Sequence, residues 1–341
     1  MSVRLDAVIG SKENNFDFIR FLAATLVILS HSFQLSGLTE IEPMLVFSKR
    51  YLSLGTFSVI VFFVISGFLI ARSYDNASSL KSYVFARILR IYPALIVTVL
   101  LTVFVLGPLL TNVPIQAYFG DSKTMRYLLN CFSQRMYFHL PGVFIKNVIT
   151  VVNGPLWSLP FELVCYVMII MFGELIKKRF LRAIVVSGII VCMCYFIDIH
   201  AWKNIIRFMF FFACGSIFYV FRSRIVLNKA VAALCIVVLL SVIYLNLHRH
   251  VKDAILGVTL SYVILTFSYM KSSLNHFARH GDFSYGLYVL AWPVQQLFVQ
   301  FVPGLNHYIN FVLSFAVTLV LAYASWHLIE KRFLRLKAHF R

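Results

Sequence analysis

The stretch FDFIRFLAATLVILSHSF, residues 16–33, decides the fold because it is long and apolar enough to form a membrane helix. A helix needs about 20 mainly apolar residues to cross the hydrocarbon core of a bilayer. The same stretch carries Asp17, Arg20 and His31, three ionisable residues that a lipid-facing helix normally excludes. The sequence therefore predicts a membrane helix that keeps polar side chains for a functional reason.

The composition of the whole chain agrees with that prediction. Hydrophobic residues make up 60% of the 341 residues, charged residues only 13%, and the mean hydropathy is +0.84. Because soluble domains are about a quarter charged, we expect an all-α polytopic membrane protein. The net charge of +18 comes from short basic clusters between apolar runs, a pattern typical of topology signals rather than nucleic-acid binding. The cysteines lie mostly in apolar runs and predict no metal site.

Ten apolar runs predict about ten transmembrane helices. They lie at about 16–36, 51–71, 91–110, 156–176, 181–197, 204–221, 230–247, 254–270, 283–302 and 308–329. With the N-terminus inside, most Lys and Arg residues fall in inner segments, so both termini are expected in the cytoplasm. Lys49 and Arg50, in the first outer connection, go against this rule. Residues 111–155 are expected to form an outer-face loop of a single membrane-embedded domain, residues 1–341, without a fused soluble domain.

The polar residues of the first span share one helix face. At 100° per residue, Asp17 and Arg20 lie within about 40° and 20° of His31, respectively. His31 also lies roughly 16 Å deeper than Arg20, near the middle of the bilayer if Arg20 is at its cytoplasmic border. Asp17 and Arg20 could simply cap and anchor the helix. His31 is the candidate for proton transfer, because its side chain titrates near neutrality and ionisable groups at that depth usually line an active site or a pathway.

A second cluster is FARILRIYP, residues 85–93, at the cytoplasmic end of the third span. Arg87 and Arg90 are three residues apart and therefore lie on one side of a helix start. Their guanidinium groups could bind phosphate in bidentate fashion, although positive-inside anchoring would produce the same pattern. Pro93 is expected in the first helical turn, where it does no harm.

Two further stretches place polar residues within apolar runs. In NGPLWSLPFELVCYV, residues 153–167, Glu162 follows Trp157 and Ser158, and it could be catalytic or simply interfacial. In FSYGLYVLAWPVQQL, residues 283–297, Tyr285 and Tyr288 share a face, and a proline breaks the span midway. Breaks at membrane depth are tolerated where the backbone faces protein or a cavity.

In this order, these stretches resemble the acyltransferase 3 family of integral membrane O-acyltransferases over nearly the whole chain. The spacing of Asp17, Arg20 and His31 is similar to the family's opening pattern. FFVISGFLI (62–70), ARILRIYPA (86–94), LWSLPFE (156–162), SYGLYVLAWPV (284–294) and HLIEKRF (327–333) resemble its later motifs. The chain departs from the family pattern at three positions. Ala86 stands before the arginine pair, where many members have an acid, and Ala291 stands before Trp-Pro, where a histidine is common. Arg332 takes the place of a proline that often follows the terminal Glu-Lys or Glu-Arg.

The resemblance implies transfer of an acyl group, most often acetyl, from cytoplasmic acyl-CoA to a hydroxyl of a cell-surface glycan or undecaprenyl-linked sugar. Such a protein is a multi-pass protein of the cytoplasmic (inner) membrane, with acetyl-CoA as co-substrate and no tightly bound cofactor. That transfer needs a general base for the hydroxyl proton, a binding site for the anionic co-substrate and groups that stabilise the developing oxyanion. The expected catalytic residues are His31 as general base with Asp17 and Glu162. Arg20, Arg87 and Arg90 are expected to bind the cofactor phosphates. The expected substrate-binding residues are Trp157, Ser158, Tyr285, Tyr288 and Ser66.

The main alternative from the residues alone is a transporter or flippase for a glycan or an anionic solute. Intramembrane Arg, His and Glu residues with a proline-broken helix are equally expected there. Transporters usually contain inverted repeats, and the sequence shows no internal repeat. The acceptor, the acylated position and the oligomeric state are left open by the sequence.

Overall fold

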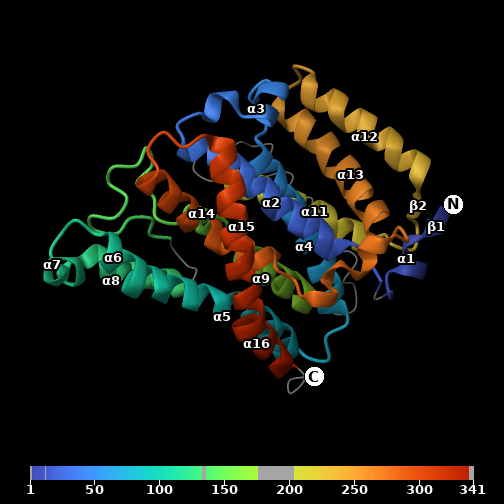
Figure 1. Ribbon diagram of the computed structural model, residues 1–341. Helices are drawn as coiled ribbons and strands as arrows, with labels where there is room; N and C mark the ends of the chain where they lie inside the picture. Colours follow the sequence, from blue (N-terminus) through green and yellow to red (C-terminus); the bar gives the residue numbers. More distant parts are fainter. Residues whose placement is uncertain (1, 12, 133–135, 176–202, 338–341) are drawn as a thin grey trace. The chain divides into compact units, whose positions relative to one another are not determined.

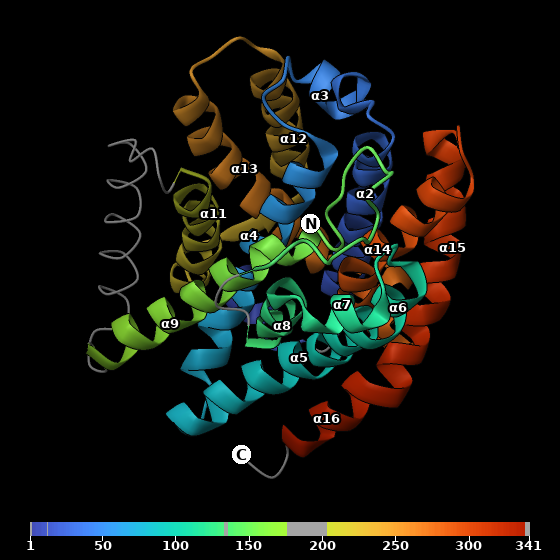
Figure 2. The same ribbon diagram turned by 90° about the vertical axis from the view of Figure 1, so that its left-hand side faces the viewer.

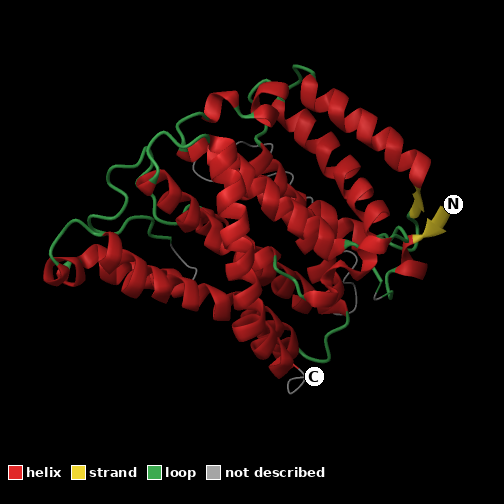
Figure 3. Cartoon of the chain, viewed as in Figure 1, coloured by secondary structure: helices red, strands yellow, loops and turns green. Residues whose placement is uncertain are grey.

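A computed structural model describes residues 2–11, 13–132, 136–175 and 203–337, and these are mostly helical (Figures 1 and 3). Five helical stretches are long and apolar enough to cross a membrane: Phe16–Leu35, Leu54–Asp75, Leu80–Leu110, Arg249–Ser268 and His307–Arg335. Shorter apolar helices cover Pro155–Met171, Ile205–Val220 and Lys229–Tyr244. The chain is therefore a polytopic all-α membrane protein, as its composition predicts.

Every expected span except 181–197 coincides with a described helix, and 181–197 lies outside the described residues. The number of spans and the side of the termini remain predictions. The contacts within the chain divide it into two compact units. Unit 1 comprises residues 1–23, 43–80 and 164–280, and unit 2 comprises residues 24–42, 81–163 and 281–341. Helices α2 (Phe16–Leu35) and α9 (Leu159–Leu175) each contribute residues to both units.

Unit 1 contains four long helices, a short β-ribbon and smaller helical segments. Its elements are β1 (Ser2–Arg4), α1 (Leu5–Val8), α3 (Pro43–Phe47), α4 (Leu54–Asp75), α11 (Lys203–Val220), β2 (Val226–Asn228), α12 (Lys229–Tyr244), α13 (Arg249–Ser268) and the 3₁₀ segment η6 (Ser273–His280). β1 pairs antiparallel with β2, which ties the start of the chain to the connection between α11 and α12. Helices α12 and α13 form a hairpin (Figure 2).

Helices α4 and α11 approach each other closely because both carry glycine at the crossing. A Cβ atom on Gly67 would lie 1.9 Å from the carbonyl oxygen of Phe212, and one on Gly215 would lie 2.1 Å from that of Val64. Ser216 then donates a hydrogen bond of 3.0 Å to the Gly67 carbonyl. Small residues at membrane-helix crossings allow such backbone contact, so the SGF stretch of the sequence has a packing role here.

Unit 2 contains the remaining helices and the long segment between the third and fourth spans. Its elements are η1 (Thr39–Ile41), α5 (Leu80–Leu101), the π-helical turn η2 (Thr102–Leu106), α6 (Gly107–Leu110), α7 (Ile115–Gly120), α8 (Ser122–Leu128), η3 (Leu129–Phe132), η4 (Pro155–Ser158), α14 (Ser284–Phe301), α15 (His307–Ser325), the π-helical turn η7 (Trp326–Glu330) and α16 (Lys331–Arg335). Helices α14 and α15 pack side by side (Figures 1 and 2) through Gly286, where an added Cβ would lie 2.9 Å from the Cβ of Ala322.

Two local expectations need correction. Helix α5 begins at Leu80, eleven residues before the predicted span, so Pro93 lies in the helix interior and not in its first turn. The residues from 80 to 90 are helical but too polar to be detected by hydropathy. In addition, Pro293 does not break its span as expected, because α14 is helical from Ser284 to Phe301. The segment 111–155, whose place on the outer face stays a prediction, contains the short helices α7, α8 and η3.

The segment 147–153 lies along α14. Gln296 donates hydrogen bonds to the carbonyl oxygens of Ile149 and Val151, and Asn153 donates one of 2.8 Å to the carbonyl of Val289. This last bond has a specific cause. In a regular helix the carbonyl of Val289 would accept a hydrogen bond from the N–H of residue 293. Pro293 has no N–H, so the Val289 carbonyl lacks its helical donor. Helix α14 continues through Pro293 because Asn153 supplies the missing donor.

Candidate active site

His31 is held in unit 2 by an aromatic contact. Its ring meets the ring of Trp292 edge-on, with 4.7 Å between the ring centroids and 80° between the planes. The Trp292 indole N–H donates to the carbonyl of Val151 at 2.9 Å, which fixes the indole in turn. The His31 ring is half-buried, and its Nδ1 atom is buried without a hydrogen bond to any residue that the structure describes. The contact with Trp292, and not a hydrogen bond to Nδ1, therefore positions the ring of His31.

The backbone of α2 beside His31 is also tied to α14. Gln295, fully buried, donates its side-chain N–H to the carbonyl of Ile28 at 2.9 Å, one turn before His31. The backbone carbonyl of Gln295 accepts a bond of 3.4 Å from Asn310 of α15. Polar side chains at membrane depth are expensive unless they find partners. These contacts hold α2, α14 and α15 together around the histidine.

The predicted substrate-binding residues Ser158 and Tyr288 contact each other. The Ser158 Oγ and the Tyr288 hydroxyl are 2.7 Å apart, and the Tyr288 hydroxyl also donates to the carbonyl of Pro155 at 3.1 Å. Glu162, one turn after Ser158, lies close enough to Tyr285 and Tyr288 to interact with both hydroxyls electrostatically. One acid and three hydroxyl groups therefore gather where η4, α9 and α14 meet.

Trp157 lies beside this group. It is half-buried, and its ring is 5.5 Å from that of Phe161 in an edge-on arrangement. A second anchor in the same stretch is Gly154, because a Cβ there would lie 3.1 Å from the Trp292 ring. The NGPLWS stretch thus packs directly on the aromatic ring that contacts His31.

Arg90 is paired with two acids that sequence reasoning did not select. Its guanidinium contacts the carboxylate of Asp282 and lies 3.7 Å from that of Glu330, which is 2% exposed and accepts a hydrogen bond from Ser325. The ring of Tyr285 is 5.9 Å from the same guanidinium, and its hydroxyl donates to the carbonyl of Ile91 at 2.9 Å. The charge of Arg90 is therefore offset by carboxylates, and it has less to offer a phosphate group than an uncompensated arginine would.

The remaining predicted residues have these surroundings. Arg87 is half-buried, with its guanidinium 5.9 Å from the ring of Tyr83. Asp17 and Arg20 form an ion pair of 3.8 Å on the part of α2 that belongs to unit 1. Ser66, also in unit 1, is half-buried on α4. The roles of these four residues stay predictions.

Sequence reasoning missed Asp282, Glu330, Asn153 and Trp292. The sequence held signals for three of them. Asp282 directly precedes the FSYGLY stretch, Glu330 lies in HLIEKRF and Trp292 lies in LAWPV. The contacts of Asp282 with Arg90, of Asn153 with Val289 and of Trp292 with Val151, however, join residues more than a hundred positions apart along the chain. Among the residues that the structure describes, no group of three or more His, Cys, Asp or Glu side chains is arranged to hold a metal ion.

Comparison with known proteins relates this arrangement to a family. The model of an acyltransferase domain matches residues 13–327. An O-acetyl transferase of Shigella phage Sf6 is 28% identical over 338 residues, which cover 95% of this chain and 96% of the phage protein. Nodulation protein 10 of Rhizobium leguminosarum bv. viciae is 40% identical over 87 residues, which cover 25% of this chain and 23% of that protein. No solved structure matches.

Proposed function

Because the chain belongs to the membrane acyltransferase family whose domain spans residues 13–327, we propose that it transfers an acyl group, most often acetyl, from cytoplasmic acyl-CoA to a hydroxyl of a cell-surface glycan or lipid-linked sugar. The full-length similarity to a phage O-acetyl transferase supports transfer to oxygen. The observation that carries the proposal is His31, a half-buried imidazole whose Nδ1 is buried and makes no hydrogen bond with the described residues.

The proposed reaction uses His31 as the general base. It accepts the proton of the acceptor hydroxyl while that oxygen attacks the carbonyl carbon of the thioester. The carbon–sulfur bond then breaks, and the thiolate takes a proton and leaves as coenzyme A. A positioned base contributes about 10²- to 10⁴-fold to such a step.

The other residues have supporting roles in this proposal. Glu162, Ser158 and Tyr288 supply hydrogen-bonding groups suited to sugar hydroxyls, and Trp157 supplies an aromatic face for a sugar ring. Arg87 and Arg20 are the candidates for the phosphates of coenzyme A. The carboxylates around Arg90 make it better suited to fixing the position of Tyr285 and the start of α14 than to binding phosphate.

We propose ten transmembrane helices with both termini in the cytoplasm of an inner-membrane protein. The support is the excess of Lys and Arg in the inner segments together with helices at all the expected spans within the described residues. The donor then enters from inside and the acceptor from outside, with His31 between them.

The test is release of coenzyme A by the purified protein, given acetyl-CoA and an acceptor glycan. We expect release with the unsubstituted protein, and a loss of at least about 100-fold for His31→Ala. A thermal melt and gel filtration show whether the variant is folded. Solute movement without release of coenzyme A would indicate a transporter, and full activity of folded His31→Ala would refute the role of the imidazole.

A further inference from the structure

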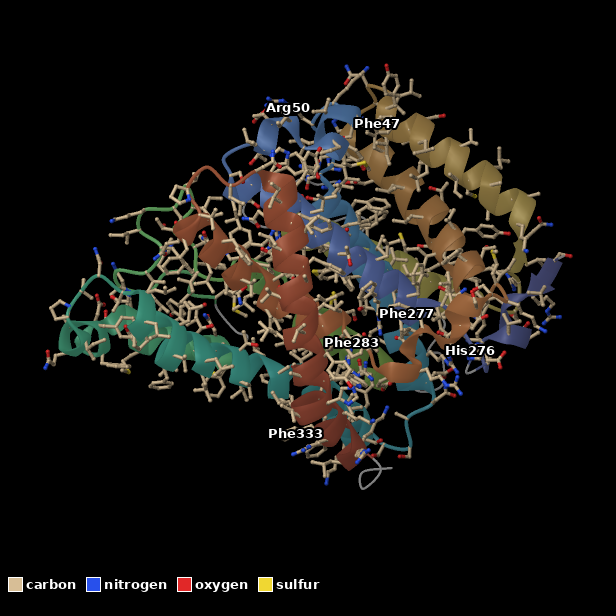
Figure 4. The ribbon with its side chains drawn as sticks, viewed as in Figure 1. Phe47, Arg50, His276, Phe277, Phe283 and Phe333 are labelled. Carbon is tan, nitrogen blue, oxygen red and sulfur yellow. The ribbon has the colours of Figure 1, made fainter. Side chains whose placement is uncertain are left out.

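Gln295 keeps one polar atom unpaired inside unit 2. It is fully buried on α14, the helix that begins directly after Phe283, which is labelled in Figure 4. Its Nε2 donates to the carbonyl of Ile28 at 2.9 Å, whereas its Oε1 is buried without a hydrogen-bond partner among the described residues. A buried polar atom without a partner costs free energy, so the position of this oxygen needs a physical reason.

The next residue shows that a buried glutamine on this helix can be paired completely. Gln296 is also fully buried, and its Nε2 donates to the carbonyls of Ile149 at 2.7 Å and Val151 at 2.8 Å. Its Oε1 accepts a hydrogen bond of 2.7 Å from Asn147. The unpaired oxygen of Gln295 is therefore not a general property of this part of α14, and its cause lies in what surrounds Gln295.

The side chain of His31 lies beside the Gln295 amide. In an α-helix the carbonyl of one residue is within reach of the side chain three residues later, as Ser and Thr show when they bond to it. Gln295 binds the carbonyl of Ile28, three residues before His31, so its amide lies next to the imidazole. Trp292 gives the same placement, because it lies on the same side of α14 as Gln295 and its ring contacts the His31 ring.

His31 contributes a second unpaired atom at this place. Its Nδ1 is buried and makes no hydrogen bond with the described residues. The Nδ1 of His31 and the Oε1 of Gln295 are not bonded to each other, and polar atoms separated by more than hydrogen-bond distance are commonly joined by water. Buried waters are held by buried polar groups that lack protein partners. The two atoms also match, because Nδ1–H can donate to a water and an amide oxygen can accept from it.

Such a water would decide a property that ring contact leaves open. The contact with Trp292 fixes where the imidazole lies, but not which of its two nitrogens carries the proton. In a neutral histidine this is set by the hydrogen bond that one of the nitrogens makes. A histidine that acts as a base loses activity steeply in the wrong tautomer.

We propose that Gln295 is a positioning residue that acts on His31 through one buried water between its Oε1 and the imidazole Nδ1. The water keeps the proton of the neutral imidazole on Nδ1, so that Nε2 accepts the proton of the acceptor hydroxyl. When Nε2 takes up that proton, the ring becomes an imidazolium and its Nδ1–H stays bonded to the water. This inference rests on the proposed function, since it names the atom of His31 that acts as the base and the residue that selects it.

The experiment reads the tautomer of His31 by carbon–nitrogen correlation NMR. The full chain, with isotope-labelled histidine, is measured in lipid bilayers at pH 8, where an unperturbed imidazole is neutral. The signals of His31 are those that disappear in His31→Ala. We expect the proton on Nδ1 in the unsubstituted protein and a mixture of both tautomers in Gln295→Met, which keeps the length of the side chain and removes its polar atoms.

Gln296→Met is the matched control. It removes more hydrogen bonds than Gln295→Met does, yet it should leave the tautomer of His31 unchanged. If this control does not fold, Asn310→Ala takes its place, because Asn310 donates to the backbone carbonyl of Gln295 and not to its side chain. Thermal melts of all variants show which of them are folded.

Coenzyme A release gives a second measure. We expect Gln295→Met to lower kcat about 5- to 10-fold, the factor that one hydrogen bond supplies, with KM for acetyl-CoA unchanged. Gln295→Glu keeps an oxygen acceptor at the same distance and should recover most of kcat. A role limited to the bond with the Ile28 carbonyl predicts an equal loss in both variants.

Three results would overturn the inference. They are a proton on Nε2 of His31 in the unsubstituted protein, an unchanged tautomer in folded Gln295→Met, and equal loss of kcat in the Met and Glu variants. The tautomer is measured without substrate, whereas the proposed function is decided by coenzyme A release from the unsubstituted protein. Failure of the water site and failure of the transferase are therefore distinguishable.

Discussion

Substitution of Asn153 tests how the segment 147–153 and α14 hold the candidate site together. Its side-chain N–H donates to the Val289 carbonyl at 2.8 Å, and Asn153 is fully buried. Removing the amide leaves a buried carbonyl without a donor, which costs about 1–3 kcal/mol. We therefore expect Asn153→Ala to lower the free energy of unfolding by about 2 kcal/mol, and to lower the melting temperature by about 3 °C in a chain of this size.

The decisive variant is the double substitution Asn153→Ala with Pro293→Ala. Alanine at position 293 has an N–H that reaches the Val289 carbonyl in the ordinary helical pattern. We expect this to restore about 1 kcal/mol, the net contribution of one hydrogen bond. Pro293→Ala alone should change stability little, because the carbonyl already has a donor.

The assay is thermal unfolding of the purified protein in detergent, followed by tryptophan fluorescence for all four members of the cycle. Coupling between positions 153 and 293 is the predicted signature, since contacting residues show non-additive effects. If the double variant is no more stable than Asn153→Ala, the proline is not the reason for the contact, and our account of α14 is wrong.

Three other substitutions test further parts of the structure. Asp282→Asn should lower kcat of coenzyme A release more than it raises KM for acetyl-CoA if Arg90 fixes the site instead of binding phosphate, and a rise in KM alone would contradict that role. Gly67→Ala should prevent stable folding, because its Cβ would lie 1.9 Å from a backbone oxygen, whereas Gly10→Ala, with open space around it, should melt as the unsubstituted protein does. Tyr118→Phe should cost about 1 kcal/mol, because the Tyr118 hydroxyl donates to the Val103 carbonyl at 2.9 Å. Burial raises the pKa of Tyr118 to about 12, so this stabilisation is complete below the unfolded pKa near 10 and is lost as the pH rises from 10 through 12. A shift of two pKa units is worth about 2.7 kcal/mol, so melting of the two proteins compared from pH 8 to 12 should show the difference closing and then changing sign.

Hydropathy predicts the membrane helices of this chain well, for a physical reason. A run of about 20 apolar residues has few other stable uses, so the spans within the described residues coincide with helices. Hydropathy does not detect helix outside the hydrocarbon core. It therefore missed the first turns of α5, from Leu80 to Arg90, and placed Pro93 at a helix start instead of the interior.

For the candidate site, too, the sequence predicts one part and misses another. Residue type and depth select His31, because an imidazole in the middle of an apolar run is expensive and needs a purpose. They do not reveal partners. The contacts of Arg90 with Asp282 and of Ser158 with Tyr288 join residues 192 and 130 positions apart, and nothing in a single sequence specifies such pairs. Asn153 was equally hidden, although a proline inside α14 indicates that some donor must replace its missing N–H.

Hydrogen bonds from three side chains fix the helices that hold the histidine. Trp292, Gln295 and Asn153 each donate to a backbone carbonyl, and these bonds fix α14 against the segment 151–153 and against α2. Arg90 is held by carboxylates. His31 is placed by ring contact, and its Nδ1 has no hydrogen-bond partner among the described residues. The Oε1 atom of Gln295 and the Oδ1 atom of Asn153 are also buried without a partner there. What distinguishes His31 from these amides is therefore its ionisable ring, because such groups at membrane depth are costly and usually line an active site or a pathway.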